Sequence, residues 1–437
     1  MNLFKGKKIL IFGLGLNQGG VGSARFFAQN GAKVRVTDLR YAEVLKPSVD
    51  ELKQFPDIEY CLGGHKNEDI DWADIIIKNP AVKPGNPYIE YALKNSKPVE
   101  MDMDIFLEFI RPSQIIGVTG TKGKSTTASL IYEILKNTEK KVILAGNIGI
   151  SVLDTILHIH PETLIVLEIS SFQLGSFEKH KVSPKWAVIT NITPDHLNYY
   201  SKIEKYLEAK KIIGKYQTSE DFLFLRRDDP ITTKSDFLKG FKGQVVYFSK
   251  DDFPKDFKPQ LKGEHNLENI AAAYQVGKTF NIEEALIFKT LADFKGIPFR
   301  MEVVKEWDGI KIINDTAATS PESAIKAIQT YPGCILICGG MNKGMDYKEF
   351  VKVMEQNVKK VFFVEGASTD EIKKLITKKD LIAGIYNDFE KLLSDLKKIV
   401  KAGNTILLSP AATSFNLFNN EFDRGKKFNE AVEKVFK

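Results

Sequence analysis

The chain has 437 residues, which at about 150 residues per domain corresponds to roughly three domains. Lysine and arginine total 62 and aspartate and glutamate total 56, so the net charge of +6 is small for this length. The lysines are spread along the chain, which indicates a solvated surface and no dedicated nucleic-acid-binding face. No apolar run reaches about 18 residues, so we expect no transmembrane helix and no membrane insertion.

Lysines 5, 7 and 8 precede a short apolar run, an arrangement that signal peptides share. The run ends at Gly13 with no small-residue cleavage site, so it predicts a first strand at 8–12. The cysteines Cys61, Cys334 and Cys338 form no CxxC pair and are expected to be small core residues in a reducing compartment. We therefore expect a cytoplasmic protein, and we expect it to be a monomer.

Residues 1–101 alternate short apolar runs with helical patterns. Strands are predicted at 8–12, 33–37 and 75–77, and a helix starts at 23–29. This alternation predicts a parallel, doubly wound sheet. The glycine-rich turn at 13–20 resembles a dinucleotide fingerprint, although Gln18 stands where its third glycine belongs, and Asp38 ends the second strand where a ribose-binding acid is usual. The pattern indicates a nucleotide diphosphate site and gives NAD little support.

Two further α/β units follow, at 102–297 and 298–437. The first has predicted strands at 115–118, 164–167, 186–190 and 222–225 and ends with a helix at 266–280. The second has predicted strands at 311–313, 334–338, 361–364 and 405–409. The predicted fold is therefore α/β in three domains: an N-terminal Rossmann-like domain, a central P-loop ATPase-like parallel sheet and a C-terminal Rossmann-like domain.

The strongest motif is the segment 119–126, TGTKGKST, between a predicted strand and a predicted helix. In that setting backbone N–H groups and the helix N-terminus face an anion. Lys124 would reach the β- and γ-phosphates, and Ser125 or Thr126 would contact Mg²⁺. Val118 stands where the Walker pattern has its first glycine, so this is a variant loop. The alternative is a glycine-rich turn that binds nothing.

Two polar segments follow other strands of the same predicted sheet. Glu168 ends the strand at 164–167, and His196 lies in the segment NITPDHL after the strand at 186–190. Ligands bind at the carboxyl ends of parallel strands, and a carboxylate there can hold Mg²⁺. The alternatives are a helix-capping glutamate and a structural histidine.

Lys210 lies on the apolar face of a predicted helix, in register with Ile203, Tyr206, Leu207 and Ile213. Burial would lower its pKa and leave a nucleophilic neutral amine. The alternative is a long side chain whose ammonium reaches solvent, which the sequence alone favours.

Together these motifs resemble the Mur ligases, over all three units. TGTKGKST, EISSFQL, NITPDHL and YLEAKK are similar to the family's central-domain signatures in order and spacing. KGEHNLENIAAA at 262–273 resembles its HNxxN helix, and PFRMEVV at 298–304 resembles its HRxE hinge. Within the family the pattern is most similar to the glutamate-adding members, through the segments GLGL at 13–16, NPA at 79–81, GNIG at 146–149, NDTAATSP at 314–321, GGMNKGMD at 339–346 and LLSPAATSF at 407–415.

This resemblance implies an ATP-dependent ligase that adds D-glutamate to UDP-N-acetylmuramoyl-L-alanine through an acyl phosphate, in peptidoglycan precursor synthesis. It implies ATP and two Mg²⁺ ions as cofactors, and domains that bind the UDP-sugar, ATP and glutamate in that order along the chain. Other Mur-type ligases, using L-glutamate or another amino acid, remain open. A folylpolyglutamate synthase usually starts near the phosphate loop, and an NAD-dependent dehydrogenase would leave that loop unexplained.

The resemblance also implies residue roles. The catalytic set would be Lys124, Glu168, His196 and Lys210, the last as a carbamate. Ser125, Glu168, His196 and Lys210 would hold the metal ions. The nucleotide would be bound by Gly120, Thr121, Lys122, Gly123, Lys124, Ser125, Thr126, Asn266, Asn269, Arg300 and Asp315. The substrates would be bound by Leu16, Asp38, Arg40, Asn79, Asn147 and Ser170 for the UDP-sugar, and by Thr319, Lys343, Ser414 and Phe415 for glutamate. Two positions depart from the pattern: Ala317, where the family usually has lysine, and the segment around Glu421, near which the family tends to have an aromatic residue and this chain has Asn-Glu-Phe-Asp at 420–423.

Overall fold

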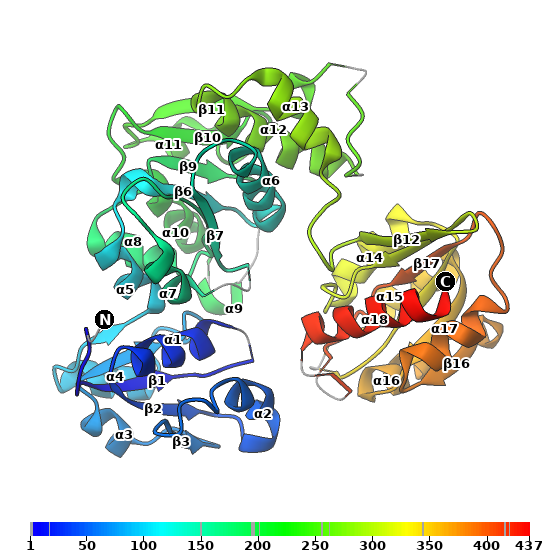
Figure 1. The fold of residues 1–437 in the computed structure, drawn as a ribbon, viewed down its shortest axis with the longest axis horizontal. Helices are drawn as coiled ribbons and strands as arrows, with labels where there is room; N and C mark the ends of the chain where they lie inside the picture. Colours follow the sequence, from blue (N-terminus) through cyan, green and yellow to red (C-terminus); the bar gives the residue numbers. More distant parts are fainter. Residues whose placement is uncertain are drawn as a thin grey trace. The chain divides into compact units, whose positions relative to one another are not determined.

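The structure is a computed structural model, and it describes residues 3–16, 18–148, 151–193, 197–200, 202–254, 257–261, 263–342, 345–414, 417–418 and 420–437. The chain forms two compact units, 1–294 and 295–437. The first unit contains two β-sheets and the second contains one, each with helices on both faces (Figure 1). The expected three-domain α/β fold is confirmed.

The first sheet is parallel throughout, in the order β3-β2-β1-β4-β5. Its strands are β1 (Lys8–Phe12), β2 (Lys33–Asp38), β3 (Glu59–Leu62), β4 (Ile75–Lys78) and β5 (Val99–Glu100). Its helices are α1 (Gln18–Gln29), α2 (Ala42–Glu51), α3 (Asn67–Trp72) and α4 (Pro87–Lys94). The strand order reverses between β1 and β4, and the carboxyl ends of such a pair form the usual ligand-binding crevice.

Helix α1 begins five residues before the predicted start at residue 23. Its first turn contains Gly19 and Gly20, and glycine has a low helical propensity, so the sequence did not predict a helix there. A side chain at position 20 would lie 2.1 Å from the carbonyl oxygen of Leu14, so this position requires glycine. The close approach of helix and loop explains why a glycine-rich segment is helical here.

The second sheet is also parallel, in the order β11-β10-β9-β6-β8-β7. Its strands are β6 (Ile115–Thr119), β7 (Val142–Gly146), β8 (Leu164–Glu168), β9 (Trp186–Ile189), β10 (Phe222–Arg226) and β11 (Gln244–Phe248). The helices of this domain are α5 (Asp102–Phe109), α6 (Lys124–Lys136), α7 (Val152–Thr155), α8 (Leu174–His180), α9 (Leu197–Tyr200), α10 (Ile203–Lys215), α11 (Ser235–Leu238), α12 (Glu264–Thr279) and α13 (Glu284–Asp293). Strand β6 is buried along its whole length, with β8 and β9 as its neighbours.

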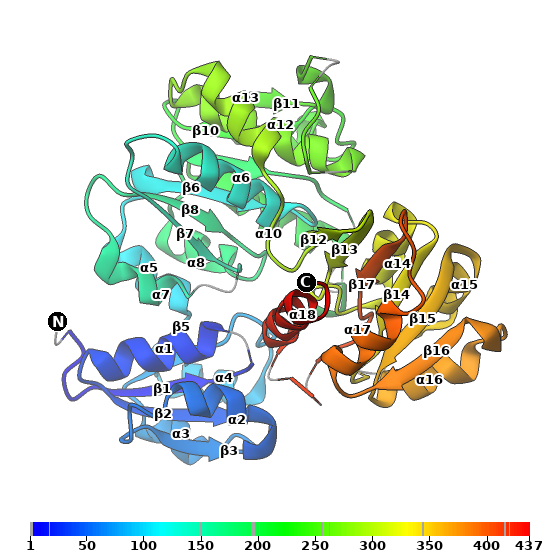
Figure 2. The same cartoon turned by 45° about the vertical axis from the view of Figure 1, so that its right-hand side comes forward.

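The two sheets of the first unit share one hydrophobic cluster, which extends from Ile9 and Phe27 to Leu167 and Ile213. Helix α1 packs against α7 (Figure 2). At this contact Arg25 forms a 2.6 Å ion pair with Asp154. The two sheets therefore belong to one compact unit.

The third sheet is mixed, in the order β12-β13-β17-β14-β15-β16, because β12 runs antiparallel to β13. Its strands are β12 (Glu302–Trp307), β13 (Ile310–Asn314), β14 (Cys334–Cys338), β15 (Val358–Val364), β16 (Ile382–Tyr386) and β17 (Thr405–Leu408). Its helices are α14 (Pro321–Thr330), α15 (Lys348–Asn357), α16 (Ala367–Leu375), α17 (Phe389–Lys397) and α18 (Glu421–Val435). The antiparallel hairpin of β12 and β13 was not predicted and departs from a purely Rossmann-like sheet.

No helix in the described part of the chain is long and apolar enough to cross a membrane. The three cysteines are free, and Cys334 and Cys338 are fully buried in β14, as expected for core residues. Burial raises the pKa of Cys334 to about 12, so this thiol is inert at neutral pH.

Candidate active site

The phosphate loop lies between β6 and α6, the position predicted for it. Gly120 and Gly123 have φ angles of 148° and 83°, which residues with a side chain rarely adopt. The ammonium of Lys124 donates to the carbonyl oxygens of Gly120 (3.0 Å) and Thr121 (2.9 Å). The loop therefore curls around the first lysine of α6, with the N-terminus of that helix at its open side.

Glu168 lies at the end of β8, directly beside the phosphate-loop strand. Its Oε1 accepts a hydrogen bond from Asn147 Nδ2 at 3.0 Å. Its Oε2 is buried and has no hydrogen-bond partner among the described residues. A buried carboxylate oxygen without a donor is costly unless a cation binds it, so Glu168 fits a Mg²⁺ ligand.

The predicted metal ligand His196 lies outside the described residues. Within the described part of the chain, no group of three or more His, Cys, Asp or Glu side chains comes close enough to form a metal site. Thr193, just before the undescribed residues, exchanges two hydrogen bonds with the hydroxyl of Thr121 at 3.0 and 3.1 Å. The loop that leads to His196 is thus attached to the phosphate loop.

Lys210 is buried, with a relative exposure of 1%. Its ammonium donates to Thr119 Oγ1 and to the carbonyl oxygen of Gly120, both at 2.9 Å, and lies 5.3 Å from the Tyr206 ring centroid. The reading of Lys210 as a solvent-reaching lysine is therefore wrong. Through these two hydrogen bonds the side chain holds the start of the phosphate loop.

Helix α12 closes the other side of the loop. Asn269 Oδ1 accepts from Thr127 Oγ1 at 3.3 Å, and Asn269 Nδ2 donates to Asn266 Oδ1 at 3.1 Å. A side chain at Gly123 would lie 2.2 Å from Asn269 Oδ1. Both predicted nucleotide-binding asparagines are therefore buried at the phosphate loop.

Asp38 joins two loops at the carboxyl end of the first sheet. Its two carboxylate oxygens accept from the backbone N–H groups of Gly15 and Arg40, each at 2.9 Å. Ser48 Oγ donates to the carbonyl oxygen of Gly15 at 2.8 Å. The structure thus shows Asp38 organising the glycine-rich turn, a role that its position at a strand end did not indicate.

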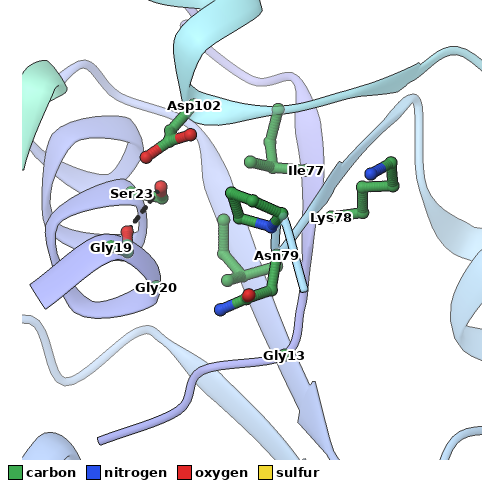
Figure 3. Close-up of a pocket in the computed structure, with 10 residues that line it drawn as sticks. Gly13, Gly19, Gly20, Ser23, Ile77, Lys78, Asn79 and Asp102 are labelled. Atoms are coloured by element: carbon green, nitrogen blue, oxygen red, sulfur yellow. Dashed lines mark hydrogen bonds between the residues drawn. The ribbon is translucent and has the colours of Figure 1, made fainter. Parts of the chain in front are cut away.

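A pocket lies at the carboxyl ends of β1 and β4, the point where the strand order reverses. It is lined by Ile11, Gly13, Gly19, Gly20, Ser23, Ile77, Lys78, Asn79, Pro80 and Asp102. Figure 3 shows Asn79 between the first turns of α1 and Lys78. Burial raises the pKa of Asp102 to about 6, and burial lowers the pKa of Lys78. Neither Lys78 nor Asp102 was singled out in the sequence.

The predicted UDP-sugar residues are divided between the two sheets of the first unit. Asp38 ends β2, and Leu16, Arg40 and Asn79 follow strands of the first sheet. Asn147 and Ser170 follow β7 and β8 of the second sheet, and Ser170 Oγ donates to Gln173 Oε1 at 3.0 Å.

In the second unit, Asp315 follows β13 and is almost fully buried. Its carboxylate accepts from Ser409 Oγ (2.8 Å) and from the Met301 N–H (3.2 Å). Burial raises the pKa of Asp315 to about 7, and the charge of the exposed Arg300 opposes that shift. Phe299 and Met301 have positive φ angles of 68° and 47°, so the predicted hinge segment stores backbone strain.

Arg424 connects the two loops that carry Thr319 and Ser414. Its guanidinium is fully buried and donates to Thr316 Oγ1 (2.8 Å), the Thr316 carbonyl oxygen (2.9 Å) and the Ala412 carbonyl oxygen (3.1 Å). Burial lowers the pKa of Arg424 to about 10. Ser414 Oγ is buried with no hydrogen-bond partner among the described residues.

Sequence reasoning missed Arg424, because an arginine in an amphipathic helix is usually a surface residue. Lys343 and Phe415 lie outside the described residues. Of the two departures, Ala317 is half-buried, and Glu421 is followed by Phe422, whose ring lies 6.1 Å from that of Phe299. Phe422 therefore places an aromatic ring next to Glu421.

Three protein-family models match the chain in the order of its sheets. The model described as "Mur ligase MurD-like, N-terminal domain" matches residues 7–100, "Mur ligase middle domain" matches 118–262, and "Mur ligase, glutamate ligase domain" matches 299–412.

Curated relatives match over nearly the whole chain. Proteins named UDP-N-acetylmuramoylalanine--D-glutamate ligase are 36% identical in Roseiflexus sp. (strain RS-1), over 98% of both chains, and 37% identical in Borreliella burgdorferi, over 99% of this chain and 98% of the relative. The relative of that name in Clostridioides difficile is 35% identical, over 99% of both chains.

Solved structures share the fold at low sequence identity. UDP-N-acetylmuramate-alanine ligase MurC from Thermotoga maritima is 19% identical, with a TM-score of 0.62 over 98% of this chain and 99% of that one. A MurF ligase from Thermotoga maritima, solved in complex with ADP, is 19% identical, with a TM-score of 0.56 over 99% of this chain and 96% of that one. With the phosphate loop, Glu168 and three matching domains in place, the chain belongs to the Mur ligase family, in the branch of the D-glutamate-adding ligases.

Proposed function

We propose that this protein is an ATP-dependent ligase that joins D-glutamate to UDP-N-acetylmuramoyl-L-alanine, with release of ADP and phosphate, in peptidoglycan precursor synthesis. The observation that carries the proposal is end-to-end similarity to ligases of that name, at 33–37% identity. The phosphate loop beside Glu168, whose Oε2 has no hydrogen-bond partner among the described residues, supports the same chemistry independently.

The reaction has two chemical steps. The substrate carboxylate attacks the γ-phosphorus of ATP, which forms an acyl phosphate and ADP. The amine of glutamate then attacks the acyl carbon, and inorganic phosphate leaves as the amide forms. Phosphoryl transfer needs charge neutralisation and in-line positioning more than covalent assistance.

The central domain would supply most of these groups. We assign binding of the phosphates to the backbone N–H groups of residues 120–126 and to the ammonium of Lys124. To reach the phosphates, this ammonium would give up its hydrogen bonds to the carbonyl oxygens of Gly120 and Thr121. Ser125 and Glu168 would hold one Mg²⁺, and His196 and Lys210 a second. When bound, Mg²⁺ neutralises the charge that develops on the transferred phosphoryl group. Asn266 and Asn269 would position the nucleotide from α12, and Arg300 and Asp315 from the C-terminal domain.

Lys210 would serve the second metal ion as a carbamate. The amine lies at the phosphate loop, 2.9 Å from Thr119 Oγ1 and from the Gly120 carbonyl oxygen. An unmodified ammonium there would repel a divalent cation, because both groups carry positive charge. A carbamate is an oxygen anion, the kind of ligand that Mg²⁺ prefers.

The two remaining substrates would bind in different domains. Leu16, Asp38, Arg40, Asn79, Asn147 and Ser170 would line the UDP-sugar site, and Thr319, Lys343, Ser414 and Phe415 the glutamate site. We place the domain limits at 1–101, 102–297 and 298–437 and expect closure of the C-terminal domain before chemistry. We further propose that the protein acts as a monomer in the cytoplasm.

Ala317 supports a second candidate within the same chemistry, because the family usually has lysine there. A glutamate site with one cation fewer could accept L-glutamate or another amino acid.

Phosphate release measured with ATP, Mg²⁺ and UDP-N-acetylmuramoyl-L-alanine tests the proposal, with D-glutamate, L-glutamate and other amino acids supplied in turn. We expect release that depends on both the UDP-sugar and D-glutamate, and a product whose mass equals the two substrates joined with loss of water. Release only with another amino acid would replace the proposed acceptor, and no release with any would refute the ligase assignment.

A further inference from the structure

The phosphate loop is shorter than a Walker loop and is supported from outside. Val118, at the place of the first Walker glycine, is a fully buried residue of β6, which runs on to Thr119. Only residues 120–123 separate the strand from α6. Such a short loop has few internal hydrogen bonds available, so its conformation depends on neighbouring elements.

The support comes from the end of the neighbouring strand β9. Beyond the last strand residues, the parallel ladder continues, since the Thr190 N–H donates to the carbonyl oxygen of Thr119 at 3.0 Å. The Thr121 N–H then donates to the carbonyl oxygen of Asn191 at 2.9 Å. The backbone of residues 190 and 191, directly after β9, thus holds the first half of the loop.

The side chain of Asn191 holds the second half. Its Oδ1 accepts from the N–H of Lys122 at 3.1 Å, and its Nδ2 donates to the carbonyl oxygen of the same residue at 2.9 Å. Thr190 Oγ1 donates to that carbonyl oxygen as well, at 2.6 Å. One carboxamide therefore satisfies both polar backbone groups of one loop residue, as a further strand peptide would.

This pairing requires a side chain with one hydrogen-bond donor and one acceptor, as asparagine has. A carboxamide presents one acceptor and one donor side by side, as a peptide group does. Aspartate can only accept, and it would face the carbonyl oxygen of Lys122 with a negative charge. Alanine leaves the N–H of Lys122 without this acceptor and leaves its carbonyl oxygen with Thr190 Oγ1 as the remaining donor.

We propose that Asn191 is a positioning residue for ATP, which holds the Lys122 peptide so that the phosphate loop is already in its binding conformation before the nucleotide arrives. The inference rests on the proposed function only in taking this loop as the ATP site. A preordered loop loses less conformational entropy on binding, so the effect belongs to nucleotide affinity.

The test compares Asn191→Asp and Asn191→Ala with the wild-type protein. The affinity for ADP is measured by calorimetry, and the KM values for MgATP and for the UDP-sugar are measured by phosphate release. Loss of two neutral hydrogen bonds corresponds to about tenfold or more in affinity. We expect that rise in the ADP dissociation constant and in the KM for MgATP, with an unchanged KM for the UDP-sugar and a larger effect for aspartate than for alanine.

Asn137→Ala is the matched control. Asn137 lies at the opposite end of α6, where its Nδ2 donates to Thr290 Oγ1 at 3.0 Å. The Asn137→Ala variant removes a carboxamide hydrogen bond far from the phosphate loop, and we expect unchanged ADP affinity. If the Asn191 variants only lower the melting temperature and keep wild-type ADP affinity, Asn191 is merely structural and the proposal is wrong.

Two further outcomes are informative. If the Asn191 variants do not fold, Thr190→Val removes the other donor to the same carbonyl oxygen, and unchanged ADP affinity in that variant overturns the proposal. A wild-type protein that binds ADP but releases no phosphate with the proposed substrates contradicts the proposed function and leaves the ADP comparison valid.

Discussion

Asn147 Nδ2 donates to Glu168 Oε1 across 3.0 Å, which connects the loop after β7 to the end of β8 beside the phosphate loop. The same pair is joined in the backbone, where the Asn147 N–H donates to the carbonyl oxygen of Glu168 at 3.0 Å. One carboxylate oxygen of Glu168 is thereby held in place, and the other remains without a donor among the described residues. The carboxylate is oriented before any cation binds.

Glu168→Gln should weaken Mg²⁺ binding and should change the stability of the fold much less. Glutamine keeps an oxygen for Asn147 but loses the negative charge, so the Mg²⁺ concentration for half-maximal phosphate release should rise by more than about tenfold. Glu162→Gln, an exposed residue just before β8, is the control and should behave as wild type. An unchanged Mg²⁺ requirement in Glu168→Gln would remove this residue from the metal site.

Lys124→Ala should abolish phosphate release and leave binding of the UDP-sugar nearly intact. The ammonium is the cation at the centre of the phosphate loop, and phosphoryl transfer depends on charge neutralisation there. UDP-sugar binding is followed by calorimetry. Lys136→Ala, in the last turn of the same helix, should keep full activity. Equal loss of activity and UDP-sugar binding in Lys124→Ala would indicate misfolding instead.

Lys210→Ala should lose nearly all activity, because a carbamate ligand to the second metal ion would be missing. A small added carboxylate should restore part of the activity by occupying the vacated anionic position. The control is Lys211→Ala, on the next position of α10, where the lysine is partly exposed and pairs with Glu208. Mass spectrometry of protein prepared without removal of CO₂ should detect the modification.

The outcome of Lys210→Ala also separates two structural roles. Loss of activity with no rescue by any carboxylate would favour an unmodified ammonium that supports Thr119 and Gly120. Retention of most activity would exclude both roles.

Asp102→Asn should stabilise the protein at neutral pH. Burial raises the pKa of Asp102 from 3.8 to about 6, so between those values the folded state retains a proton that the unfolded chain has lost. The free energy of unfolding contributed by this group therefore falls as pH rises from about 4 to about 6 and stays low above that. Removing the charge should add about 2–3 kcal/mol at pH 7 and much less at pH 4.

Denaturant unfolding at pH 4 and pH 7 measures this difference. Asp57→Asn, an exposed aspartate before β3, is the control for introducing an amide and should change stability little at either pH. A stability gain in Asp102→Asn that is equal at both pH values would show that the gain does not come from ionisation.

Lys343→Ala should raise the KM for glutamate much more than the KM for MgATP. A charged hydrogen bond to a substrate carboxylate contributes about 1.5–3 kcal/mol, so the expected rise is about tenfold to a hundredfold. Lys348→Ala, an exposed lysine at the start of α15, should leave both KM values unchanged. An unaffected glutamate KM in Lys343→Ala would place the carboxylate elsewhere.

The interior strands of all three sheets were predictable from the sequence. Strands such as β6 and β14 are buried on both faces and appear as continuous apolar runs. The six strands that were not predicted are β3, β5, β7, β11, β12 and β16, and these are the two edges of each sheet. An edge strand is half-exposed, as in β11 and β16, so its residues carry no uniform pattern and its pairing depends on the neighbouring strand.

The candidate site also has a part that the sequence predicted and a part that only the structure revealed. Local sequence determined the phosphate loop and the position of Glu168, because a loop between strand and helix and a carboxylate at a strand end are properties of neighbouring residues. Only the tertiary structure decided that Lys210 lies beneath that loop, that Asn191 completes it, and that Arg424 is buried between two substrate loops. Each of these depends on contacts between residues about 70 to 110 positions apart in the sequence. Tertiary packing decides whether such a polar side chain ends beside a hydrogen-bond partner or in water.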